Sequence, residues 1–127
     1  MFTFKVKDKE YKIKFSINAM AENDLMDRVQ SLFQMMEEDG TVKIVRELAL
    51  TIRELIYVGS QKYNPIESVE EAGNVFDDYF DEHKEQGDTD ITTTFFGMFV
   101  KDLQDEGFMG DLLETMMKNQ KVEKKKK

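Results

Sequence analysis

The single histidine is the first side chain to consider for acid–base chemistry or metal binding. His83 is the only histidine in 127 residues, so a site built from several histidines is excluded. No G-x-S-x-G sequence accompanies it, and a serine triad is therefore not indicated. A solvated residue at the edge of a helix is the simpler interpretation of His83.

Two pairs of adjacent carboxylates could also flank a metal ion. They are Asp77-Asp78 and Asp81-Glu82. Pairs of this kind are more typical of an exposed acidic helix face. The phosphate-binding patterns GxxxxGK[ST] and GxGxxG do not occur in the chain.

A short segment faintly resembles the start of a calcium-binding loop. Asp88, Asp90 and Thr92 match its first ligand positions. The loop requires glycine at its sixth position and glutamate at its twelfth, where this chain has Thr93 and Phe99. We therefore expect no metal, no other cofactor and no enzymatic activity.

The elements that position these residues begin with a predicted β-hairpin over residues 2–15. Apolar and polar side chains alternate strictly on both sides of a short polar segment, which indicates two strands with one apolar face. We expect the turn at Asp8-Lys9. The cross-strand pairs would then be Val6 with Tyr11, Phe4 with Ile13 and Phe2 with Phe15. Because an isolated hairpin is only marginally stable in water, other elements must cover this face.

Residues 16–117 are predicted to be helical. Ser16 can cap a first helical region that runs to Glu38, with a break or second cap at Asn23-Asp24. The most regular amphipathic pattern begins at Thr41 and ends near Val58. Its wide apolar stripe predicts the helix that packs most deeply against the sheet.

Further caps divide the second half of the chain. Ser68 and Glu71 form a capping box for a helix that continues towards Gly87. The segment 88–90 precedes a helix with an aromatic face, which ends at Gly107, and a short apolar segment starts at Asp111. The predicted fold is therefore α+β, with an N-terminal β-hairpin packed against a predominantly α-helical bundle of four to five helices. We expect one globular domain, residues 1–117, and a flexible lysine-rich tail, residues 118–127.

Composition limits the classes of partner. The net charge of −8 argues against a nucleic-acid binder, and no apolar run is long enough for a membrane span. The start of the chain has a strand pattern and not that of a signal peptide. Basic side chains cluster on the hairpin, where they could serve solvation, bind an acidic partner or steer self-association. The candidate self-association residues are Lys5, Lys7, Lys12 and Lys14.

The sequence from Phe4 to Met20, FKVKDKEYKIKFSINAM, resembles the opening of the tail assembly chaperones of siphophages that infect Gram-positive bacteria. The shared features are Lys9-Glu10-Tyr11 at the turn, Lys14-Phe15 in the second strand and Ala19 in the following helix. The likeness continues more loosely through the central and aromatic helices. The chain differs in having Asp8 where that family often has Asn-Gly, and in a longer first helical region.

The resemblance implies a protein that binds the tape measure protein, keeps it soluble and helps recruit tail tube subunits. It also implies a place in the host cytoplasm and not in the mature virion, and it is compatible with a homo-oligomer. The chain contains nine methionines and ten phenylalanines, which could fill gaps in the core or form an adaptable client surface. The candidate client-binding residues are Met35, Met36, Phe95, Phe99, Met116 and Met117.

Four lysines close the sequence. They imply an A-rich message, on which a ribosome can slip, and the resemblance implies that such slippage makes a minor extended form that contacts the tail tube. A lysine tail that aids solubility is an equally simple interpretation. The acidic segment 67–90 also leaves open an alternative function, a small phage or bacterial interaction module such as an inhibitor or a DNA-mimicking regulator.

Overall fold

The chain folds as an N-terminal two-stranded antiparallel sheet followed by helices. The computed structural model describes residues 1–38, 41–105 and 115, and the side chains of residues 36–38, 41–43 and 105 lie outside this description. Within these residues the elements are β1 (Phe2–Val6), β2 (Lys9–Ile13), α1 (Ile17–Glu22), α2 (Leu25–Glu38), α3 (Thr41–Ser60), α4 (Val69–Glu85) and α5 (Ile91–Asp105). The predicted α+β fold, with a hairpin packed against a helical bundle, is confirmed.

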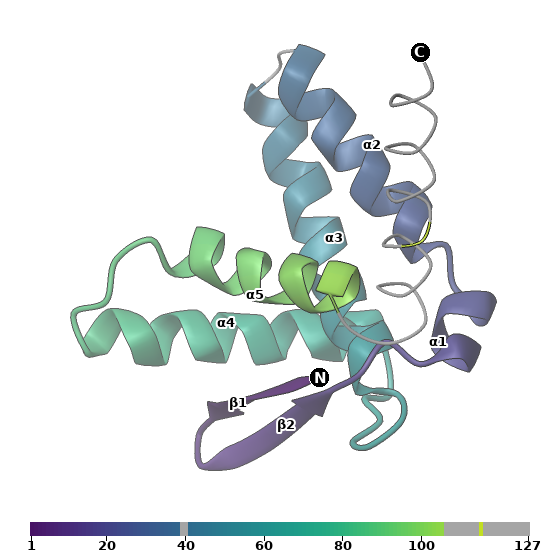
Figure 1. The fold of residues 1–127 in the computed structure, drawn as a ribbon. Helices are drawn as coiled ribbons and strands as arrows, with labels where there is room; N and C mark the ends of the chain where they lie inside the picture. Colours follow the sequence, from purple (N-terminus) through teal and green to yellow (C-terminus); the bar gives the residue numbers. More distant parts are fainter. Residues whose placement is uncertain (39–40, 106–114, 116–127) are drawn as a thin grey trace, which may run out of the picture.

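The four longer helices form two antiparallel pairs, α2 with α3 and α4 with α5 (Figure 1). Helices α4 and α5 lie side by side next to the β-hairpin, whereas α2 and α3 form a helical hairpin that projects away from it. The C-terminal end of α3 returns to the sheet and packs on β2, and α4 packs on β1. The sheet therefore rests on two helices that come from different pairs.

The turn of the β-hairpin lies one residue earlier than predicted. Lys7 and Asp8 have φ angles of 49° and 65°, as a two-residue type I′ turn requires. The register is Phe2 with Ile13, Phe4 with Tyr11 and Val6 with Lys9, so the predicted pairs are wrong. The pairing differs by two residues, and a shift of two leaves every side chain on its predicted face.

The predicted helix starts agree with the observed caps. The Ser16 hydroxyl accepts a hydrogen bond from the Ala19 backbone N–H at 3.2 Å, and the Ser68 hydroxyl accepts one from the Glu71 N–H at 3.1 Å. The predicted break also exists, because Asn23 is extended between α1 and α2 and its side-chain amide donates to the Ala19 carbonyl at 2.7 Å. Local side-chain chemistry thus sets these boundaries.

The outer edge of β2 is closed by the end of α3 and the loop after it. The Lys14 N–H donates to the Gly59 carbonyl at 2.9 Å, and the Lys12 N–H donates to Asn64 Oδ1 at 2.7 Å. Gly59 makes the close approach possible, since a Cβ there would lie 2.7 Å from Ile13 Cγ2. An edge strand that could otherwise pair with another chain is covered in this way.

Aromatic rings fill the space between the hairpin and the helices. The Phe4 ring stacks on Tyr11 with centroids 5.2 Å apart and meets the Phe95 ring edge-on, also at 5.2 Å. Phe99 contacts Phe2 and Phe95, with centroid distances of 4.9 and 4.8 Å. The aromatic side of α5 therefore covers the apolar face of the hairpin together with α4 and the end of α3.

Charged contacts join elements that are distant in the chain. Arg28 of α2 bridges to Glu54 of α3 at 2.5 Å and to Glu47 at 3.5 Å. The N-terminal amine of Met1 pairs with the buried carboxylate of Asp102 in α5.

No helix among the described residues is long and apolar enough to cross a membrane. The predicted apolar segment from Asp111 and the tail 118–127 lie outside the described residues, apart from Thr115.

Candidate functional site

His83 lies near the end of α4 and has a local partner. Its Nδ1 is 2.7 Å from Asp88 Oδ2, and the centroid of its ring lies 4.1 Å from the centroid of the Tyr79 ring. Burial, together with the negative charge of Asp88, raises the pKa of the Tyr79 phenol above its ordinary value of 10.0. This cluster fixes the loop that follows α4, and it includes no serine or cysteine nucleophile within hydrogen-bonding distance among the described residues.

The acidic pairs of α4 face different ways. Asp78 and Glu82 contact the hairpin turn, where Lys7 Nζ is 3.4 Å from Asp78 Oδ1 and the Lys7 N–H donates to Glu82 Oε2 at 2.9 Å. Asp77 and Asp81 are exposed. In the part of the chain that the structure describes, no three histidine, aspartate or glutamate side chains converge as metal ligands.

The prediction that Phe95 and Phe99 contact a client is wrong for this structure. Both side chains are 0% exposed and sit at the centre of the aromatic core. Their spacing in the chain is that of a helix face, and this face is turned towards the hairpin because Phe2, Phe4 and Phe15 need cover. Met35 is half-buried on α2. The side chains of Met36, Met116 and Met117 lie outside the described residues.

The four candidate self-association lysines have different surroundings. Lys7 is held by α4, and the ammonium of Lys12 lies 4.6 Å from the centre of the Tyr63 ring. Lys14 is half-buried, and its backbone is bonded to Gly59. Lys5 is exposed at the centre of β1 and forms no ion pair within the described part of the chain.

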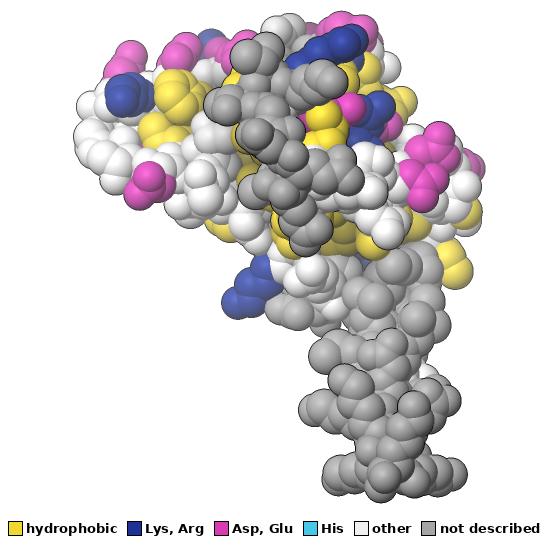
Figure 2. Space-filling view, turned by 90° about the horizontal axis from the view of Figure 1, so that it is seen from above, with side chains coloured by type: hydrophobic (Ala, Val, Ile, Leu, Met, Phe, Trp, Pro, Cys, Tyr) yellow, Lys and Arg dark blue, Asp and Glu magenta, His cyan; other side chains and the backbone are white. Residues whose placement is uncertain are grey.

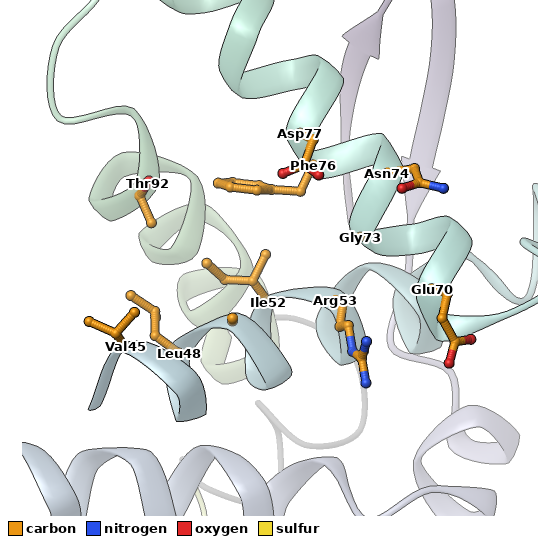
Figure 3. Close-up of a pocket in the computed structure, with 11 residues that line it drawn as sticks. Val45, Leu48, Ile52, Arg53, Glu70, Gly73, Asn74, Phe76, Asp77 and Thr92 are labelled. Atoms are coloured by element: carbon orange, nitrogen blue, oxygen red, sulfur yellow. The ribbon is translucent and has the colours of Figure 1, made fainter. Parts of the chain in front are cut away.

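A groove of about 460 Å³ lies between α3, α4 and the start of α5, and we take it as the candidate functional site. We call it the α3–α4 groove. Figure 3 shows Arg53 and Glu70 together at one end, whereas Val45 and Thr92 lie at the other. Its lining residues are Val45, Leu48, Ala49, Ile52, Arg53, Glu70, Gly73, Asn74, Phe76, Asp77 and Thr92.

Small side chains keep the α3–α4 groove hollow. Gly73 has no side chain, and a Cβ placed there would meet only the Cδ of Arg53, at 3.9 Å. Ala49 contributes a single methyl group to the opposite wall. Val45 is 65% exposed at the open end, although it belongs to the apolar stripe of α3. Apolar surface is therefore left accessible where α3 and α4 diverge.

The two walls of the α3–α4 groove differ in chemistry. Helix α3 supplies aliphatic side chains, and α4 supplies Glu70, Asn74 and Asp77 beside the ring of Phe76. Arg53, Glu70 and Asp77 form no ion pair within the described part of the chain. An apolar wall thus faces an acidic one, and one arginine lies at the end where they meet.

The sequence contains one signal for this groove, in the apolar stripe of α3. The apolar stripe of α3, to which Val45 belongs, is wider than one buried face requires, because Ala49 and Leu50 extend it. This width predicts a helix packed deeply against the sheet, whereas the structure leaves Val45 and Ala49 exposed. A stripe that exceeds one face can indicate a second apolar contact surface.

Other exposed apolar side chains are scattered. Figure 2 shows the hydrophobic side chains on one face in small groups between charged ones. Apart from Val45, the large exposed members among the described residues are Met1, Ile17, Met26, Phe33 and Tyr63. Singly exposed apolar residues are ordinary on protein surfaces and carry little functional weight.

Comparison with known proteins yields no relative: no family model, no curated protein and no solved structure matches this chain.

Proposed function

We propose that this protein is a phage tail assembly chaperone that binds the tape measure protein and keeps it soluble in the host cytoplasm. The proposal combines the resemblance of residues 4–20 with the open α3–α4 groove, and the exposed apolar wall around Val45 is the observation that carries it. A long helical client exposes apolar stripes before assembly, and such stripes aggregate unless they are covered.

The partners follow from the same proposal. The chain would bind the tape measure protein transiently, recruit tail tube subunits through a frameshift-extended form, and be absent from the mature virion. It would bind neither nucleic acid nor membrane, and it would act without a cofactor or catalysis. Copies could assemble along one client through the exposed surface around Lys5.

The test is co-expression of the tape measure protein from the same phage with and without this chain. We expect the soluble fraction of the tape measure protein to rise with the chain and to fall again with Val45→Asp. Ile17→Asp is the matched control, because Ile17 is 63% exposed on α1 and lies outside the groove. Insoluble tape measure protein despite abundant folded chain would refute the proposal.

A second candidate function is favoured by the exposed acids of α4. Glu70, Asp77 and Asp81 are exposed, and an acidic helix can compete with DNA for a basic protein surface. Against this, Asp78 and Glu82 are engaged by Lys7 of the same chain, so the acidic surface is partly neutralised. Binding to a DNA-binding protein that competes with DNA and weakens steeply with salt would support this alternative.

A further inference from the structure

We infer that the α3–α4 groove selects amphipathic helices whose apolar face is flanked by lysine or arginine. This inference rests on the proposed function only in naming the class of client, since the groove itself is a feature of the structure. It concerns which side chains the groove accepts, and therefore which segments of a client are bound.

The apolar wall of the α3–α4 groove can bind the apolar face of a client helix. Leu48 and Ile52 lie one turn apart on α3, and Val45 extends the row to the open end of the groove. Phe76 contributes its ring from the other helix. Side chains at positions i and i+3 or i+4 of a client helix would meet this row, which is the usual mode of helix-in-groove recognition.

The acidic wall determines the charge of the client. Glu70 and Asp77 line the groove without an ion pair among the described residues, and Arg53 supplies one positive charge against these two negative ones. A basic side chain beside the apolar face of the client would reach the carboxylates of α4, whereas an acidic one would be repelled. The net charge of −8 would also speed the approach of a basic segment.

The empty space at Gly73 gives the client room. A side chain at this position would project into the groove, because only Arg53 Cδ lies within 4 Å of a Cβ built there. Replacing Gly73 by leucine would therefore fill the space without removing a charge, and it would favour the helical state of α4.

The experiment measures binding of the full chain to labelled synthetic helices by fluorescence anisotropy. The first peptide has a leucine face flanked by lysines, the second has glutamate in place of each lysine, and the third has the composition of the first in a scrambled order without an apolar face. We expect the lysine peptide to bind about tenfold more tightly than the glutamate peptide and the scrambled peptide to bind more weakly still. Equal binding of the lysine and glutamate peptides would overturn the inference.

Variants then place the binding site. Gly73→Leu should abolish binding, whereas Gly97→Leu should not. A Cβ at Gly97 of α5 meets nothing within 4 Å, so leucine is tolerated there, and Gly97 lies outside the groove. The double variant Glu70→Gln and Asp77→Asn should weaken binding of the lysine peptide about three- to tenfold and reduce its salt dependence. Glu10→Gln with Glu22→Gln changes the net charge equally at exposed sites outside the groove and should have a smaller effect.

The outcomes separate this inference from the proposed function. If both Gly97→Leu and Gly73→Leu lose peptide binding, or if both retain it, the α3–α4 groove is not the binding site. Selective peptide binding by a chain that fails to keep the tape measure protein soluble would refute the chaperone proposal and leave the groove specificity standing. A chain that keeps the tape measure protein soluble but binds the lysine and glutamate peptides equally would refute the groove specificity and leave the chaperone proposal standing.

Discussion

The backbone N–H of Lys7 donates a hydrogen bond to the side chain of Glu82, which lies 75 residues away in the chain, at 2.9 Å. The ammonium of the same lysine pairs with Asp78, one turn earlier on α4. These two contacts hold Lys7 at the start of the turn with a φ of 49°, a conformation that lysine rarely adopts. The turn of the hairpin is thus positioned by a helix and not only by its own sequence.

The position of the turn can be tested with glycine. Because Asp8 has a φ of 65° at the second turn position, Asp8→Gly should raise the free energy of unfolding by about 0.5 kcal/mol. Lys9→Gly should lower it by a similar amount, about 0.5 kcal/mol, since Lys9 belongs to β2. Urea denaturation followed by circular dichroism would measure both. Stabilisation by Lys9→Gly instead would favour a turn at Asp8-Lys9.

Alanine should have opposite effects on stability at two glycines, Gly59 at the close contact between α3 and β2 and Gly97 in open space on α5. Gly59→Ala should lower the free energy of unfolding by about 1–3 kcal/mol, because the new methyl would overlap Ile13 Cγ2 at 2.7 Å. Gly97→Ala should raise it by about 0.5–1 kcal/mol, since it lies within helix α5 in open space and alanine favours the helix. Thermal unfolding of the two variants side by side is the measurement. A Gly59→Ala variant as stable as the parent chain would contradict the close contact between Gly59 and Ile13.

Phe95 offers a direct test of its place in the core. Truncation by Phe95→Ala should cost about 3–5 kcal/mol of stability, because the ring is fully buried among Phe4, Tyr79 and Phe99. Equilibrium unfolding in urea would show this as a lower midpoint. Thr93→Ala, at an exposed position on the same helix, is the control and should change stability little. An unchanged midpoint for Phe95→Ala would instead indicate a surface role for the ring.

The raised pKa of Tyr79 predicts how the stability of the fold changes at alkaline pH. Its pKa is raised in the folded state by burial and by Asp88, so the folded state holds the phenolic proton more tightly than the unfolded chain does. The resulting stability is fully present below the ordinary pKa of 10.0 and is lost as the pH rises through the higher folded pKa. Tyr79→Phe should therefore show a smaller loss of stability above pH 10.0 than the parent chain. Unfolding midpoints measured on both sides of that pH would decide, and identical profiles would contradict the assignment.

The sequence by itself determined the local structure. Alternation predicted both strands and their buried face, and Ser16 and Ser68 predicted two helix starts, because these signals act between residues close in the chain. It did not determine the register. Registers that differ by two residues bury the same face, and the contacts from α4 to Lys7 favour one of them.

Only the tertiary structure decided which apolar side chains are core and which are surface. Phe95 and Val45 both lie on apolar helix faces, yet Phe95 is fully buried by the hairpin and Val45 is 65% exposed where α3 and α4 diverge. A one-dimensional pattern shows that a face is apolar but not what covers it, because the cover comes from elements distant in the chain. The α3–α4 groove arises from that difference.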